Sequence, residues 1–194
     1  ELLTEIEYNK EPLFVGLDTY QRNDGEYYFA NDFVATSLSG MEYVLRFDGR
    51  QNVSLWVTKD YNRSKGGYVT KESYVGAYDK VADLVYGGFG STQNQFYETG
   101  ATIYIRIPWM WLNITDPSQK MVLNNLSSDL GEKANSIATN GILFSVMIGD
   151  NETKDVLYQF PEQKQDPGYK TYKWAEWADV KDYTFSERDS FDVV

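Results

Sequence analysis

The stretch from Ala101 to Trp109 constrains the fold of this chain more than any other segment. Its sequence, Ala-Thr-Ile-Tyr-Ile-Arg-Ile-Pro-Trp, places an apolar residue at every second position before the proline. A period of two is typical of a β-strand with one buried and one polar face. Pro108 then ends the pairing, because proline has no N–H to donate to a ladder. The segment predicts a strand whose buried face carries Ile103, Ile105 and Ile107.

Three further segments predict strands from the same alternation. Residues 41–47 and 51–58 alternate on either side of Asp48-Gly49, a strong turn signal, and together they predict a hairpin. Residues 142–148 alternate again. We expect the buried face of this last strand to carry Phe144, Val146 and Ile148.

The balance of strand and helix signals predicts an all-β protein, an antiparallel β-sandwich of jelly-roll-like form. Residues 13–17 add a short apolar strand, and only residues 119–138 could hold a helix, although their apolar spacing is poor. No repeat or linker divides the chain, so we expect a single domain over residues 1–194. Residues 59–95 and 113–140 are expected to be long connecting loops, which often shape a binding edge in a sandwich.

The composition excludes several classes of site and partner. The chain has no cysteine and no histidine, which rules out a disulfide, a Ser-His nucleophile, a histidine-bound haem and a Cys/His zinc site. Oxygen ligands remain, so calcium is the metal that this chain could bind. A net charge of −11 argues against nucleic acid and anionic membrane surfaces as partners. No apolar run is long enough for membrane insertion.

The first residues and the missing cysteine suggest where the protein works. The chain opens at Glu1-Leu2-Leu3 without a methionine or a signal peptide. We interpret it as a domain excised from a larger extracytoplasmic protein, with the neighbouring domains of that parent chain as partners. An acidic chain without cysteine suits an exported bacterial protein. We therefore expect an extracellular, cell-surface or periplasmic location.

Four segments in order resemble family 9 carbohydrate-binding modules and the wider group of DOMON-like β-sandwich domains. They are Leu13-Phe-Val-Gly-Leu-Asp-Thr19, Gly40-Met-Glu-Tyr-Val-Leu45, Ile103-Tyr-Ile-Arg-Ile-Pro-Trp109 and Gly141-Ile-Leu-Phe-Ser-Val-Met-Ile-Gly-Asp150. A closing tract rich in tryptophan, Tyr172-Lys-Trp-Ala-Glu-Trp177, follows them. The resemblance implies a β-sandwich that binds carbohydrate without catalysis.

Tryptophan residues are the first candidates for sugar contacts, because an aromatic face stacks on the apolar C–H face of a pyranose. Trp174 and Trp177 lie three residues apart in the closing tract. Trp56 shares a strand face with Ser54 and Thr58, because the apolar residues of that strand claim the other face. The alternatives are core packing for Trp174 and Trp177, and cover by a long loop for Trp56.

The polar face of the first predicted strand carries two further candidates, Tyr104 and Arg106. The guanidinium of Arg106 offers five donors that suit vicinal hydroxyl groups or a uronate. The alternative is an exposed cross-strand pair of Arg106 with Glu42 or another acid. Trp109 and Trp111 follow this strand, and we expect them to plug one end of the sandwich.

Two acidic clusters are candidates for a calcium site, because closely spaced oxygen atoms are the ligands of calcium. The first is the turn made of Asp150, Asn151 and Glu152. The second, weaker cluster comprises Asp18, Asp24 and Glu26. Neither has the spacing of an EF-hand loop, so a solvated turn is the favoured alternative for both.

These observations favour a non-catalytic carbohydrate-binding module that holds an oligosaccharide or polysaccharide by aromatic stacking and hydrogen bonds. The alternative is a structural or protein-interaction sandwich that positions a neighbouring catalytic or membrane domain. Glycoside hydrolysis is a third hypothesis, well behind the other two. It needs two carboxyl groups at a defined separation, and no motif in the sequence singles out such a pair. We therefore expect a protein that is not an enzyme.

Overall fold

The fold was analysed on a computed structural model of the chain. The residues that the structure describes are 6–19, 25–30, 33, 35–59, 61–62, 67–68, 78–100, 102–123, 136–162 and 171–175. Residues 61–62 and 67–68 are described by their backbone alone.

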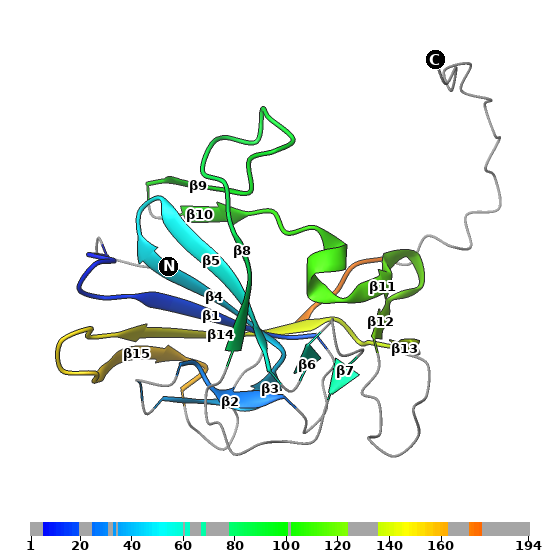
Figure 1. The fold of residues 1–194 in the computed structure, drawn as a ribbon, viewed down its shortest axis with the longest axis horizontal. Coiled ribbons are helices and arrows are strands. Elements are labelled where there is room, and N and C mark those ends of the chain that lie inside the picture. The colour runs from blue at the N-terminus through cyan, green and yellow to red at the C-terminus, as the bar shows by residue number, and fades with distance from the viewer. Residues whose placement is uncertain are drawn as a thin grey trace.

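A seven-stranded antiparallel sheet forms the centre of the molecule (Figure 1). Six strands follow one another across it in the order β15-β14-β1-β4-β5-β8, and β16 pairs with β14 beside β15. Their bounds are β1 Leu13–Asp18, β4 Tyr43–Gly49, β5 Asn52–Thr58, β8 Tyr78–Asp83, β14 Ile142–Gly149, β15 Val156–Phe160 and β16 Thr171–Tyr172.

Smaller sheets lie around the central sheet. In Figure 1 a hairpin of β9 and β10 lies above it, and the three-stranded sheet β11-β12-β13 lies at one end. A short 3-10 helix, η2, connects the hairpin to this sheet, and a second, η3, connects β11 to β12. The bounds are β9 Phe96–Thr99, β10 Thr102–Ile105, η2 Trp109–Leu112, β11 Ile114–Asp116, η3 Pro117–Gln119, β12 Met121–Leu123 and β13 Ser136–Ala138. Two-stranded sheets complete the fold, with β2 Glu26–Tyr28 beside β3 Thr36–Met41 and β6 Tyr61–Asn62 beside β7 Gly67–Tyr68.

Both faces of the middle strands of the central sheet carry a hydrophobic core, whereas its edge strands β8 and β15 are partly exposed. The larger hydrophobic cluster lies between the central sheet and the β9–β13 segments, and its buried members include Leu17, Leu45, Leu55, Phe96, Leu112 and Val122. The smaller cluster lies on the opposite face, and its buried members are Phe14, Phe29, Ala30, Phe33, Ala35, Met41, Val44 and Met147. We name these the first core and the second core.

This arrangement confirms the predicted all-β, sandwich-like fold and the hairpin at residues 41–58. The register pairs Tyr43 with Val57 and Leu45 with Leu55. The predicted loops at 59–95 and 113–140 are wrong in part, because they contain β8 and the three strands of the β11–β13 sheet. The helix considered at 119–138 is wrong where that segment is described, because Met121–Leu123 and Ser136–Ala138 are strands.

The predicted faces of the strand at 101–107 are right, but its burial is less than expected. Ile103, Ile105 and Ile107 are half-buried and pack against the first core, whereas Tyr104 and Arg106 are exposed. The reason is that β10 belongs to a two-stranded hairpin over the central sheet. Its side chains therefore have a neighbouring strand, β9, on one side only. Of the three residues expected to be buried in β14, Ile148 is buried, whereas Phe144 and Val146 are half-buried.

None of the described residues belongs to a helix of the length and apolarity that a membrane span requires.

Candidate functional site

The β9–β10 hairpin separates an apolar inner face from an aromatic outer face. Strand alternation sends Phe96 of β9 and Ile103 of β10 toward the first core. The next residue along each strand, Tyr97 and Tyr104, then points outward, and the register places these two tyrosines directly opposite each other. Residues directly opposite in an antiparallel pair have their Cβ atoms close together, so the two rings meet.

The outer face carries a continuous row of ring contacts. The rings of Tyr97 and Tyr104 are stacked, with centroids 4.7 Å apart and planes 7° apart. Phe89 meets Tyr97 edge to face at 4.9 Å, and the guanidinium of Arg106 lies 4.1 Å from the centroid of the Phe89 ring. Tyr104 ends the row with 41% of its surface exposed and no further ring partner among the described residues. We name these four residues, Phe89, Tyr97, Tyr104 and Arg106, the hairpin platform.

Hydrogen bonds in the loop before β9 hold Phe89 in place. The backbone N–H of Gly87 donates to the Phe96 carbonyl at 2.9 Å, and the Asn94 side-chain amide donates to the Gly88 carbonyl at 2.7 Å. The Arg106 guanidinium also donates to the Ser91 carbonyl, at 3.3 Å, across the same loop. The platform is therefore built on a fixed backbone.

Arg106 does not form the acidic pair considered from the sequence. It makes no ion pair with any residue in the described ranges, and Glu42 is fully buried. The Glu42 carboxylate instead accepts hydrogen bonds from the Thr19 backbone N–H at 2.6 Å and the Thr19 hydroxyl at 3.1 Å. Among the described residues, the Arg106 guanidinium contacts a backbone carbonyl and an aromatic ring.

The sequence around the hairpin platform differs from the rest of the chain in its low number of charged residues. Residues 84–115 contain only two charged residues, Glu98 and Arg106, in a chain of which 24% is charged. Depletion of charge combined with aromatic residues and arginine is typical of interaction surfaces. This pattern could have pointed to Phe89 and Tyr97, which periodicity alone missed.

Trp174 is part of the core rather than an exposed platform. Only 9% of its surface is exposed, and its indole N–H donates to the Pro117 carbonyl at 2.7 Å. Its ring lies 4.9 Å from that of Trp109 and 6.2 Å from that of Tyr172. The structure thus favours the core alternative for Trp174, and we leave it out of the candidate site. Trp177 lies outside the described residues.

Trp56 shares the second face of β5 with two buried neighbours, Ser54 and Thr58. Its indole N–H donates to the Ser54 hydroxyl at 2.7 Å, and the Lys80 ammonium lies 5.8 Å from the centroid of its ring. The side chain is half-buried, so the neighbouring edge strand β8 supplies part of its cover. Trp109 and Trp111, in η2, are half-buried and pack against the first core.

The first calcium candidate is a turn held together by its own hydrogen bonds. The Asp150 carboxylate accepts from the N–H groups of Glu152 and Thr153, each at 2.8 Å, and the Lys154 ammonium donates to the Asn151 side-chain oxygen at 2.9 Å. The hydrogen bond from the Thr153 backbone lowers the pKa of Asp150 most. Within the described ranges, no group of three or more acidic side chains is arranged to hold a metal ion.

The second acidic cluster is not a solvated turn, because Asp18 and Glu26 are buried. Glu26 accepts from the backbone N–H groups of Tyr27 and Tyr28, at 2.8 and 3.1 Å. Tyr78 packs nearby, and burial, followed by the charges of Glu26 and Glu42, raises its pKa well above the usual value. Asp24 lies outside the described residues.

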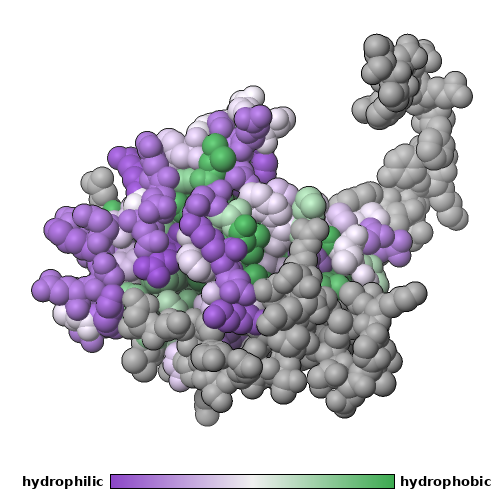
Figure 2. Space-filling model, in the orientation of Figure 1, coloured by the Kyte–Doolittle hydropathy of each residue, from purple (hydrophilic) through white to green (hydrophobic). Residues whose placement is uncertain are grey.

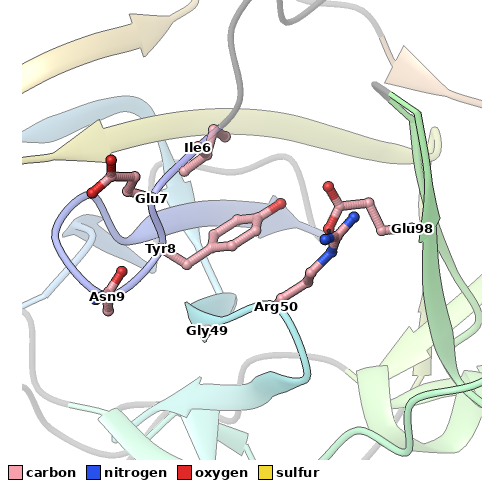
Figure 3. Close-up of a pocket in the computed structure, with 7 residues that line it drawn as sticks. All are labelled: Ile6, Glu7, Tyr8, Asn9, Gly49, Arg50 and Glu98. Atoms are coloured by element: carbon pink, nitrogen blue, oxygen red, sulfur yellow. Dashed lines mark ion pairs between the residues drawn. The ribbon is translucent and has the colours of Figure 1, made fainter.

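A small pocket lies on the inner side of the β9–β10 hairpin (Figure 3). Its volume is about 280 Å³, and its walls are Ile6, Glu7, Tyr8, Asn9, Gly49, Arg50 and Glu98. Tyr8, Arg50 and Glu98 come from three separate segments and point toward one another. Arg50 Nε lies 3.7 Å from a carboxylate oxygen of Glu98, and the Tyr8 ring packs on Phe47 at 6.2 Å. We name this the Tyr8 pocket.

The pocket changes the acidity of Tyr8. Burial, reinforced by the charge of Glu98, raises the pKa of Tyr8 from 10.0 to about 12. The phenol therefore stays neutral at physiological pH, beside the Glu98 carboxylate.

We expect the Tyr8 hydroxyl to titrate near pH 12. An ultraviolet titration of the wild type should show one more tyrosine ionising in that range than the Tyr8→Phe variant shows. Because the folded pKa exceeds the unfolded one, this contribution to stability is complete below pH 10 and declines between pH 10 and 12. A difference curve centred at pH 10 would show that Tyr8 is solvated.

A scan against protein-family models and searches of curated proteins and of solved structures find no match to this chain. The resemblance to family 9 carbohydrate-binding modules therefore stays a prediction.

Proposed function

We propose that this protein is a non-catalytic glycan-binding module and that the hairpin platform is its binding surface. Two of the residues selected from the sequence, Tyr104 and Arg106, lie on this surface together with Phe89 and Tyr97. The observation that carries the proposal is the stacked tyrosine pair that ends in an exposed ring, in a row with an arginine that has no acidic partner in the described ranges.

The chemistry of a sugar matches both ends of the platform. A pyranose has an apolar C–H face that can stack on the exposed Tyr104 ring. Its hydroxyl groups exchange bonds with water for bonds with protein, which contributes little net free energy, so the stacked ring supplies most of the affinity. Arg106 then gives direction, because its fixed fork of donors can engage two neighbouring hydroxyl groups or a uronate carboxylate.

The surroundings of the platform also suit a hydrated ligand. The loop before β9 presents serine, threonine, glutamine and asparagine side chains, which can exchange hydrogen bonds with hydroxyl groups. Hydrophilic residues cover most of the described surface in the view of Figure 2, and hydrophobic residues show only in small areas. Polysaccharide is met mainly outside the cytoplasm, so the proposal includes an extracellular, cell-surface or periplasmic location.

A glycan array followed by titration of the best ligand tests the proposal. We expect Tyr104→Ala to weaken binding at least tenfold, which corresponds to about 1.4 kcal/mol. Loss of the tyrosine stack should lower Tm by only about 2–4 °C.

The matched control is Tyr158→Ala. Tyr158 is 49% exposed on β15 and has no ring contact among the described residues, so its loss should leave glycan binding unchanged. Equal losses for both variants, or no ligand on the array, would count against the hairpin platform.

The protein-interaction alternative also has an observation in its favour. The edge strand β15 exposes three consecutive apolar or aromatic side chains, Val156, Leu157 and Tyr158. An edge strand without charged residues is open to pairing with another chain, whereas the other edge, β8, carries charged side chains. A module that binds no glycan and associates through β15 would support this alternative.

A further inference from the structure

We propose that the Tyr8 pocket binds a compact neutral molecule with neighbouring hydroxyl groups, a polyol of about the size of one sugar ring. This site is distinct from the hairpin platform. Glu98 of the pocket and Tyr97 of the platform are consecutive residues of β9, so their side chains leave the strand on opposite faces. Binding at the pocket and binding at the platform can therefore be tested independently.

The pocket contains hydrogen-bonding capacity that no residue in the described part of the chain uses. The 3.7 Å between Arg50 Nε and the Glu98 carboxylate is too long for a hydrogen bond. Arg50 donates no hydrogen bond to any residue that the structure describes, although its guanidinium carries five N–H groups. The Glu98 carboxylate lies beside the Tyr8 hydroxyl and offers about four lone-pair positions, most of which stay open to a ligand. Arg50 and Glu98 thus face the same space as a long ion pair, with no hydrogen bond between them.

The charges of the pocket favour a neutral ligand. An anionic ligand would meet the Glu98 carboxylate, whose side chain is only 17% exposed, and a cationic ligand would meet Arg50. A hydroxyl group, in contrast, can donate to the carboxylate and accept from the guanidinium. Two neighbouring hydroxyl groups can therefore bridge Arg50 and Glu98 and leave neither charge uncompensated.

The size of the pocket limits the ligand to one ring. A volume of about 280 Å³ holds roughly nine water molecules at 30 Å³ each. It lies just below the range of roughly 300–1,000 Å³ that is usual for drug-sized ligands. The Ile6 side chain adds an apolar wall, and Asn9 adds an amide that can both donate and accept.

Saturation-transfer NMR on the full chain tests the site. The neutral probes are methyl α-glucopyranoside, methyl β-galactopyranoside and myo-inositol, and the charged probes are glucuronate and glucosamine. We expect at least one neutral probe to bind with a Kd of the order of 1 mM, and the charged probes to bind more weakly. Glu98→Gln and Arg50→Gln should each weaken the neutral probe about tenfold or more, because each removes a charged hydrogen-bond partner.

Two control variants make the result specific to the pocket. Asp83→Asn makes the same acid-to-amide change on the surface of β8, and Tyr104→Ala disables the platform; neither should change the affinity of the neutral probe. Arg50 is well exposed, so Arg50→Gln remains informative even if Glu98→Gln does not fold.

Four results would overturn the proposal. Three of them are no neutral probe bound below about 50 mM, tighter binding of a charged probe, and unchanged affinity in the Arg50→Gln variant. The fourth is loss of the neutral probe in Tyr104→Ala, which would assign its binding to the platform. If oligosaccharides fail on the array but the neutral probe binds and depends on Arg50, only the proposed function of the platform is refuted.

Discussion

Replacing Phe14 by alanine is expected to reduce the free energy of unfolding by about 3–5 kcal/mol, the usual cost of emptying a buried phenylalanine site. The Phe14 side chain is fully buried in the second core. Its ring meets Phe33 at 5.4 Å on one side, and the Arg46 guanidinium lies 5.4 Å from its centroid. These neighbours belong to other segments, so they cannot all move in to fill the space left behind.

Urea unfolding at constant m-value measures this loss. Leu157→Ala is the control, because Leu157 is 52% exposed on β15 and its truncation should change stability by no more than about 0.5 kcal/mol. A domain of this kind has about 5–15 kcal/mol in total, so the Phe14 variant should lose a large part of its stability. A cost below about 1 kcal/mol would show that the second core is not a packed core.

Replacing Gly141 by alanine is expected to reduce the free energy of unfolding by about 2–4 kcal/mol. Gly141 has φ +123°, a conformation that residues with a side chain rarely adopt. A Cβ atom there would also collide with the backbone carbonyl of Tyr172 in β16. The substitution should therefore separate β16 from β14 and expose Trp174, with a shift of tryptophan emission to longer wavelength.

Two other glycines separate the causes of this effect. Gly100 has φ +57° but open space around its Cβ position, so Gly100→Ala carries the conformational cost alone. Gly88 has open space and no positive φ, so Gly88→Ala should be close to neutral. If all three variants are equally stable, the close approach of β16 to Gly141 is not a feature of the native protein.

The strands that alternate strictly could be predicted from the sequence, because the period of the side chains reports one buried face directly. The strands at 43–49, 52–58, 102–105 and 142–149 agree with this pattern within two residues or so at most ends. β9 was not predicted, because Phe-Tyr-Glu-Thr carries two aromatic residues in succession and shows no period. Its position depends on pairing with β10, a contact that a single segment does not show.

The burial of individual aromatic and acidic residues also depends on contacts between distant segments. Trp174 was a candidate for an exposed ring, yet it packs on Trp109 and donates to the Pro117 carbonyl. Asp18 and Glu26 looked like surface acids, yet the layer beyond the second face of the central sheet buries them. The local sequence predicts neither the burial of Trp174 nor that of the two acids, because both depend on packing against distant segments.

The Tyr8 pocket could not have been found from the sequence for the same reason. Tyr8, Arg50 and Glu98 are far apart along the chain and carry no motif. The hairpin platform was partly accessible, because Tyr104 and Arg106 stand on the polar face of a predicted strand. Its other two residues, Phe89 and Tyr97, lie in the stretch of low charge. Only the fold shows that they lie beside Tyr104 and Arg106.

The most direct measurement of the central claim is a nitrogen-15 NMR titration of the whole chain with the best ligand from the glycan array. If the hairpin platform is the binding surface, the backbone amides that shift should gather at Phe89, Tyr97, Tyr104 and Arg106, and Tyr104→Ala should abolish these shifts. Shifts that gather on β15, or a ligand that leaves all four of these amides unchanged at saturation, would contradict the account.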